Sequence, residues 1–475
     1  MTRQATATRP ASRGGAVARS LRVRNFRLFF TGQLVSVMGT WMMVVTQDWL
    51  VLSLSDDSPT VLGLVTALQF LPMLLLTLYG GRLADRHDKR RILLTANLTA
   101  GALSLALAPL VLAGAVRVWH VCAAACCLGV VNAIETPARM SFVQEMVGPE
   151  LLPNASALSA AYFNIARICG PALGGLALTW LGAGPVLLVN AVSYLATVAA
   201  LALMRPADLR RTGSGPQQDR TVGALRYAAA RPDLMLTLGL LALVAVAGMN
   251  FQLTLPLLAK TVFHAGAGSF GLFTSAVAVG SLLCALAGTG RRTRPSARLV
   301  AGAAVAFGTA ESLTALAPGR TAALALLVVT GYTTLYFTQA VNHRLQLGSA
   351  PSHRGRVLAL YTLLLQGSTP LGATLTGWIA ARHGARTALL LGALVSLTAG
   401  LTALALDRRT APLARLPEPP AETGRGRSGR SGPGVTCLAS VDSRRSFTAV
   451  LRTGRGRRGG EIHGTPAGPA TRLRG

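Results

Sequence analysis

The chain has 475 residues, of which 51% are hydrophobic and only 13% are charged, and its mean hydropathy is +0.47. A soluble protein would carry about a quarter charged residues, so this composition excludes an ordinary soluble domain and indicates a membrane protein with several spans. The formal net charge of +29 would ordinarily favour nucleic-acid binding. The arginines, however, flank apolar runs, where membrane topology explains them, and we expect no nucleic-acid partner.

The N-terminal segment, residues 1–25, is polar and arginine-rich, and its second part alternates apolar and basic residues, as an amphipathic stretch at the cytoplasmic interface would. No cleavable signal peptide is predicted, because the first apolar run is too long for one. Twelve apolar runs follow, each about long enough to span a hydrocarbon core of roughly 30 Å. They are Phe26–Leu52, Thr60–Tyr79, Ile92–Ala115, Trp119–Val147, Ala155–Leu181, Pro185–Met204, Leu234–Leu258, Ser269–Gly288, Leu299–Ala317, Thr321–Leu347, Val357–Ala381 and Thr387–Leu406.

Positive charge alternates between successive connecting segments. Residues 82–91, 205–231, 291–298 and 344–356 each hold several cationic side chains, while the intervening connections hold few. The connection at residues 148–154 has no cation and does not bear on the alternation. Cationic connections stay on the cytoplasmic side during insertion, so both termini are predicted to be cytoplasmic.

The longest polar connector divides the chain into two similar halves. Gly174 and Trp180 of the first half recur as Gly372 and Trp378 of the second, at one offset of 198 residues. Two six-span halves repeated in parallel indicate a substrate site near the membrane midplane between them. The predicted organisation is an N-terminal segment 1–25, a six-helix bundle 26–204, a cytoplasmic linker 205–233, a second six-helix bundle 234–406, and a disordered Arg/Gly/Pro-rich tail 407–475.

The charged stretch from Gly80 to Arg91 carries the first resemblance. Gly-Arg-Leu-Ala-Asp-Arg-His-Asp-Lys-Arg, from Gly81, resembles the loop between helices two and three of major facilitator superfamily transporters. The resemblance implies that Asp85 helps to hold a cytoplasmic gate shut, through neighbouring charges and the start of helix eleven. Asp88 stands where that family has glycine, and aspartate is a mild replacement if backbone freedom is needed there. A loop that serves topology alone is the alternative. The predicted gate loop contains Gly81, Asp85, Arg86, Lys89 and Arg90.

A second motif lies in the fifth predicted span. Gly170, Pro171, Gly174 and Gly175 resemble the helix-five motif of drug:proton antiporters, although alanines replace the family's earlier glycines. Glycines four residues apart let another helix approach closely, and the proline can kink the span. The resemblance favours export over uptake. Close packing without any role in antiport is the alternative.

Charged residues inside predicted spans are costly and usually functional. Glu135 and Arg139 lie four residues apart on one helical face, and Arg167 lies at a similar predicted depth in the next span. We expect Glu135 to take up and release a proton, with the two arginines setting its affinity; a static salt bridge is an equal alternative. Asp48 can carry a proton or attract a cationic substrate, but its position near the outer end of the first span favours simple exposure. Glu311 has no evident partner in the sequence.

Polar and aromatic residues in several spans are candidates to line a cavity, with helix packing as the alternative for each. No set of histidine, cysteine and carboxylate side chains has metal-ligand spacing, so no metal is expected. The cavity candidates are Gln33, Gln69, Asn164, Asn250, Tyr336 and Gln339.

The segment from Val131 to Gly175 resembles the branch of the superfamily that contains enterobactin exporters and macrolide and drug efflux proteins. The resemblance covers about residues 26–406. It implies an all-α membrane protein with twelve transmembrane helices in two bundles, in the bacterial plasma membrane. It also implies a monomeric exporter of a small molecule, driven by a proton gradient without a cofactor.

Three other readings are open. An importer of the same fold would share every motif above. A membrane-embedded enzyme would need a nucleophile with its base or a metal pair, and the seven histidines fall mostly in predicted loops or tails. No phosphate-binding loop of the Gly-x-x-x-x-Gly-Lys-[Ser/Thr] kind occurs, so ATP hydrolysis by that route is not expected. A sensor or scaffold without transport would need a folded output domain, which the composition of the tail disfavours.

Overall fold

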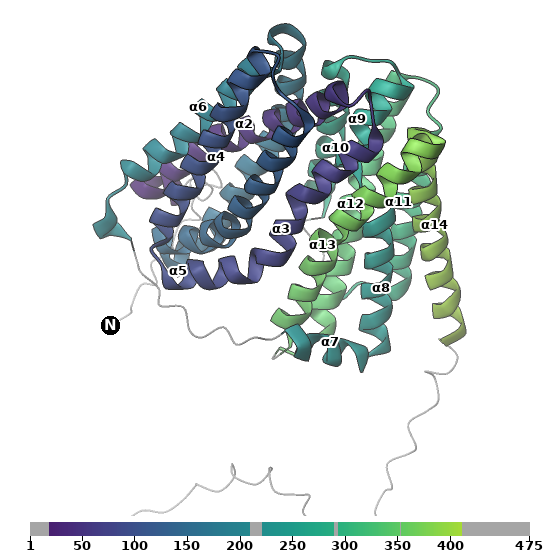
Figure 1. Cartoon of the computed structure of the whole chain (residues 1–475). Coiled ribbons are helices and arrows are strands. Elements are labelled where there is room, and N and C mark those ends of the chain that lie inside the picture. The colour runs from purple at the N-terminus through teal and green to yellow at the C-terminus, as the bar shows by residue number, and fades with distance from the viewer. Residues whose placement is uncertain (1–18, 210–220, 289–292, 352, 411–475) are drawn as a thin grey trace, which may run out of the picture. The chain divides into compact units, whose positions relative to one another are not determined.

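The computed structural model describes residues 19–209, 221–288, 293–351 and 353–410. Within these residues the chain is a succession of helices joined by short connections (Figure 1). Predictions for residues 1–18, for the middle of the linker and for the tail from residue 411 lie outside the described residues. The elements are η1 (Ser20–Arg22), α2 (Arg24–Leu54), α3 (Pro59–Arg86), α4 (Lys89–Leu112), α5 (Val118–Leu181), α6 (Ala183–Ala202), η2 (Pro206–Asp208), α7 (Thr221–Ala229), α8 (Pro232–Ala247), α9 (Phe251–Leu257), η3 (Leu258–Val262), α10 (Ala267–Ala287), α11 (Ala297–Ala315), α12 (Arg320–Gly348), α13 (Arg354–His383) and α14 (Ala385–Thr410).

By length and apolar composition, nine helical segments in the described part of the chain can cross a membrane. Helices suit this environment because they satisfy their backbone polar groups internally. The protein is therefore a multi-pass helical membrane protein. These nine segments count α5 once, although it covers two predicted apolar runs, and they do not include α11 and α13, which occupy two more. The expected total of twelve spans therefore stays a prediction.

α5 consists of two helices that meet at Gly148. The φ of 73° and ψ of 175° at Gly148 interrupt an otherwise helical stretch of 64 residues. A positive φ is readily adopted by glycine. Pro149 follows at the start of the second helix, where its missing N–H removes no hydrogen bond. The predicted polar connection over residues 148–154 is therefore wrong, because helical geometry resumes directly after Gly148.

The seventh predicted run, Leu234–Leu258, is also wrong as a continuous helix. α8 ends at Ala247, residues 248–250 are not helical, and α9 begins at Phe251. Irregular backbone at membrane depth occurs where it is buried in protein or lines a cavity, and transporters bind their substrates at such broken helices. The break thus marks a candidate binding region.

The described residues around the start of α2 pack against α5. Ser20 is buried, and its N–H donates a hydrogen bond to Asn154 Oδ1 at 3.0 Å. Phe26 and Phe29 are fully buried, and the Phe29 ring meets the Phe142 ring edge-on at 5.8 Å. Packing against α5 therefore explains the alternation of apolar residues here.

The two halves use the repeated glycine in the same way. A Cβ added at Gly174 of α5 would lie 2.7 Å from Met42 Cα of α2. A Cβ added at Gly372 of α13 would lie 2.5 Å from the Val246 carbonyl oxygen of α8. The offset of the repeat thus corresponds to equivalent close helix contacts, one in each half.

Helices of the two halves approach each other closely near the start of α3 and α10. A Cβ at Gly63 would lie 2.7 Å from the Ala373 carbonyl oxygen, and one at Gly175 would lie 2.6 Å from the Ala267 carbonyl oxygen. An apolar cluster at the same end includes Leu62 of α3 and residues of α9, α13 and α14. We call this the closed end of the protein.

Candidate functional site

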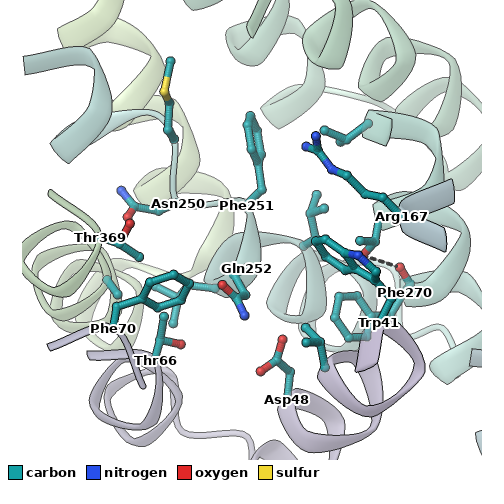
Figure 2. A pocket seen from close by; sticks show the side chains of 17 residues that line it. Trp41, Asp48, Thr66, Phe70, Arg167, Asn250, Phe251, Gln252, Phe270 and Thr369 are labelled. Atoms are coloured by element: carbon teal, nitrogen blue, oxygen red, sulfur yellow. Dashed lines mark hydrogen bonds between the residues drawn. The ribbon is translucent and has the colours of Figure 1, made fainter. Parts of the chain in front are cut away.

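A cavity of about 200 Å³, here called the central cavity, lies between the two halves (Figure 2). Its walls come from α2, α3, the second helix of α5, α9, α10, α13 and the break between α8 and α9. Most of the lining is apolar, with a few polar groups, as is usual for small-molecule sites. Its aromatic side chains are Trp41, Phe70, Phe251 and Phe270.

Asp48 lies in this cavity, and the expectation that it is simply exposed is wrong. Only 2% of the residue is exposed, and its Oδ2 has no hydrogen-bond partner among the residues that the structure describes. Trp41, Val44 and Asp48 line the cavity together because spacings of three, four and seven residues share a helical face. Depth along the helix alone misplaced Asp48, since the neighbouring helices cover it.

Arg167 lines the central cavity as well, on a different wall from Asp48 (Figure 2). No hydrogen bond or ion pair joins its guanidinium to any described residue. The sequence grouped Arg167 with Glu135, but the structure does not bring the two together. Helix rotation, which residue counting cannot supply, decides which cavity the side chain enters.

Glu135 and Arg139 line a second cavity of about 220 Å³, here called the N-bundle cavity. Arg139 Nε lies 3.8 Å from Glu135 Oε1, within a single helix. This pair therefore does not tie two helices together. Because Trp41, Phe70 and Gln252 line both cavities, the N-bundle cavity adjoins the central one.

The remaining polar candidates are divided among several places. Gln33 and Gln69 line the N-bundle cavity, and Asn250 lines the central cavity at the helix break. Tyr336 and Gln339 line a small separate cavity of about 30 Å³. Asn164 lines none of these three cavities, and its side-chain amide donates instead to the Ala160 carbonyl oxygen at 2.8 Å. The central cavity is also lined by Trp41, Thr66, Phe70 and Thr369, which no sequence motif had marked as lining residues.

The charged stretch from Gly80 to Arg91 is helical rather than a loop. α3 continues to Arg86, so only His87 and Asp88 separate it from α4. The aspartate has φ −63° and ψ 111°, an ordinary extended backbone, and its side chain accepts hydrogen bonds from the N–H groups of Arg90 and Arg91. Asp88 therefore caps α4, and left-handed backbone freedom is not needed at this position.

Among the predicted gate residues, Lys89 and Arg90 anchor α4 to its neighbours. Lys89 Nζ lies 2.5 Å from Glu145 Oε1 of α5 in a buried ion pair, a partner that the sequence did not reveal. Arg90 Nε donates to the Leu201 carbonyl oxygen at 2.7 Å, near the end of α6.

The other gate residues are free of such contacts. Asp85 and Arg86 are exposed, and neither forms a hydrogen bond or ion pair with another described residue. A Cβ added at Gly81 would meet nothing within 4 Å.

The helix-five motif packs α5 against two helices at once. Gly170 and Gly174 face α2, where a Cβ at Gly170 would lie 2.5 Å from Trp41 Cβ. Gly175 faces α10 of the other half, and the Pro171 carbonyl oxygen lies where a Cβ at Gly271 would be. The motif therefore occupies the boundary between the halves as well as the interior of the first half.

Glu311 is a buried carboxylate in the second half. It is 1% exposed, and its Oε2 lacks a hydrogen-bond partner within the described part of the chain. A Cβ at Gly248 would lie 2.9 Å from that oxygen. The carboxylate therefore lies against the break between α8 and α9, outside the lining of the central cavity.

Two helical halves that enclose a cavity at a broken helix define a membrane transporter. The chain belongs to the transmembrane secretion effector family of the major facilitator superfamily. The match to this family covers residues 16–432.

Curated relatives are also transporters rather than enzymes. The chain is 28% identical over 389 residues to the multidrug efflux pump Tap of Mycolicibacterium fortuitum, covering 78% of this chain and 92% of the pump. It is 24% identical over 267 residues to the staphyloferrin A transporter of Staphylococcus aureus, covering 55% of this chain and 66% of that transporter.

Solved structures share the fold at low sequence identity. The nucleoside transporter NupG (D323A mutant) aligns with a TM-score of 0.65 at 14% identity, covering 82% of this chain and 99% of that chain. A bacterial homolog of the human lysosomal transporter Spinster aligns with a TM-score of 0.65 at 15% identity, covering 84% and 99%.

Proposed function

We propose that the protein exports a drug-like compound or siderophore across the bacterial plasma membrane in exchange for protons, through twelve spans that alternate between two access states. The observation that carries this proposal is the central cavity, whose walls come from both halves and which contains the unpartnered carboxylate of Asp48. The efflux-type relatives support the direction of transport.

Contacts at the closed end support alternating access. α3 meets α13 and α5 meets α10 there at glycines, while Asp85 at the opposite end of α3 pairs with no described residue. If the cationic α3–α4 connection is cytoplasmic, the closed end is the external one and this conformation opens inward. Asp85 then contacts the other half only in the outward-open state.

Asp48 is our leading candidate for the proton-exchanging group, and Glu135 is the second. An intramembrane carboxylate in a cavity is a usual site of proton uptake and release. Asp48 lines a cavity whose walls come from both halves, so rocking of the halves would change its surroundings. Glu135 keeps Arg139 beside it on the same helix, which makes its surroundings less dependent on that motion.

Proteoliposomes loaded with a pH-sensitive dye test the proposal. A panel of antibiotics and siderophores is added under an imposed proton gradient, and both compound uptake and proton flux are recorded. We expect at least one compound to be moved uphill by the wild type and by the Asp56→Asn control, and Asp48→Asn to abolish this movement. The proposal fails if no panel compound couples to proton flux. It also fails if Asp48→Asn and Glu135→Gln both transport uphill as the wild type does.

A further inference from the structure

We propose that the central cavity binds a dipolar ligand, with a cationic group at Asp48, an anionic group at Arg167 and an apolar, aromatic body between them. This inference deepens the proposed function, on which it rests, by naming the charge pattern of the substrate. It follows from two opposite charges that line one apolar cavity and have no partner among the described residues.

The Asp48 carboxylate supplies the first half of the argument. The residue is 2% exposed and its Oδ2 accepts no hydrogen bond. A buried carboxylate without a partner is costly, and that cost is removed when a charged donor arrives. An ammonium or similar cation with N–H donors fits this requirement.

The Arg167 guanidinium supplies the second half. It lines the same cavity, and no described residue gives it an ion pair or hydrogen bond. Asp48 is not its partner either, since the two groups form no salt bridge across the cavity. A guanidinium presents a planar fork of donors that suits a carboxylate or phosphate.

The walls between these two charges fit an apolar body. Figure 2 shows the Trp41 ring between the Asp48 carboxylate and the Arg167 guanidinium in this view. Phe70 and Phe270 also face the cavity, and aromatic rings stack on planar groups. A purely cationic ligand would leave Arg167 unpaired and would be repelled by it. A purely anionic ligand would leave Asp48 unpaired and would be repelled by it.

Binding of three matched compounds to the purified full-length protein tests the inference. The probes are para-(aminomethyl)phenylacetic acid, which is dipolar at neutral pH, para-methylbenzylamine, which is a cation, and para-methylphenylacetic acid, which is an anion. Titration calorimetry at a single pH measures each affinity. We expect the dipolar compound to bind the wild type about tenfold more tightly than either singly charged compound.

Two variants assign each end of the ligand. In Asp48→Asn the dipolar compound should bind no better than the anion, and in Arg167→Gln no better than the cation. Asp56→Asn and Arg320→Gln, which remove exposed charges that are not part of the cavity lining, are controls that should keep the wild-type preference. Thermal melting verifies that each variant is folded. The comparison of the three compounds on the wild type tests the inference even if a variant fails to fold.

Equal or undetectable binding of the three compounds by the wild type overturns the inference, as does a preference that survives in both cavity variants. Because binding is measured without a proton gradient, its outcome does not depend on whether the protein couples transport to protons. Selective binding without proton-driven transport would refute the proposed export alone. Proton-driven transport with unselective binding would refute the dipolar site alone.

Discussion

Lys260 reaches from the second half to Asp57 in the first, with Nζ 2.5 Å from Oδ1. The same ammonium donates to Ser53 Oγ at 3.2 Å and lies 5.1 Å from the centre of the Trp49 ring. These contacts join η3 to the end of α2 and the turn that follows. They lie at the closed end, so they stabilise this conformation over one in which the halves separate there.

We predict that Asp57→Asn shifts the protein toward the state that is open at this end. The pair is partly exposed, so its loss should weaken closure by about 0.2–1 kcal/mol, a change of up to about fivefold in the population ratio. Spin labels at positions 60 and 381, in a cysteine-free background, would report the separation of α3 and α13. The charge-swapped variant Asp57→Lys with Lys260→Asp should restore the short distance, and Asp56→Asn should leave it unchanged. An unaltered distance distribution in Asp57→Asn would contradict this role.

Gly175→Ala should disturb closure more strongly. The added methyl would lie 2.6 Å from the Ala267 carbonyl oxygen and 3.1 Å from Gly271 Cα, and backbone atoms cannot move away cheaply. We expect spin labels at the exposed positions 181 of α5 and 272 of α10 to move apart, and transport to be slower. Gly268→Ala is the matched control, because its methyl would meet Thr179 Oγ1 at an ordinary 3.6 Å. Equal behaviour of the two variants would show that close approach at Gly175 is not needed.

Glu145→Gln should destabilise the first half. Lys89 is only 8% exposed, and the substitution leaves its ammonium without an anionic partner. Breaking a buried ion pair in this way costs about 3–5 kcal/mol. Thermal melting in detergent measures the loss. The double variant Lys89→Met with Glu145→Leu removes both charges and should recover most of the stability. If the double variant melts as low as the single one, the pair contributes more than charge compensation.

Asp88→Gly should leave transport unchanged, because the backbone at this position is extended and ordinary. Asp88→Ala should lower stability by about 1 kcal/mol through loss of the α4 cap, while glycine, a tolerated cap, should lower it by only a few tenths. Melting and transport are measured side by side for both variants. A transport defect in Asp88→Gly would instead indicate a role of the carboxylate beyond capping.

Local signals in the sequence found the helices well. Long apolar runs, basic connections and the glycine-rich motif each depend on residues close together in the chain, and α2 to α6 and α8 to α14 lie mainly in the predicted runs. The short helix α7 lies in the predicted linker instead. The errors lie where the helices begin, break or end. Gly148 and the α8–α9 break sit inside or between apolar runs, and apolar composition alone does not distinguish continuous from interrupted helix.

The sequence by itself determined the membrane setting, the two repeated halves and the residue types available for transport, because composition, charge alternation and helical spacing are local properties. Only the tertiary structure decided which charges share a cavity. Arg167 was expected beside Glu135 but lines the central cavity with Asp48, and Lys89 pairs with Glu145. Those pairings depend on the rotation and crossing of whole helices, which are set by contacts between residues far apart in the chain.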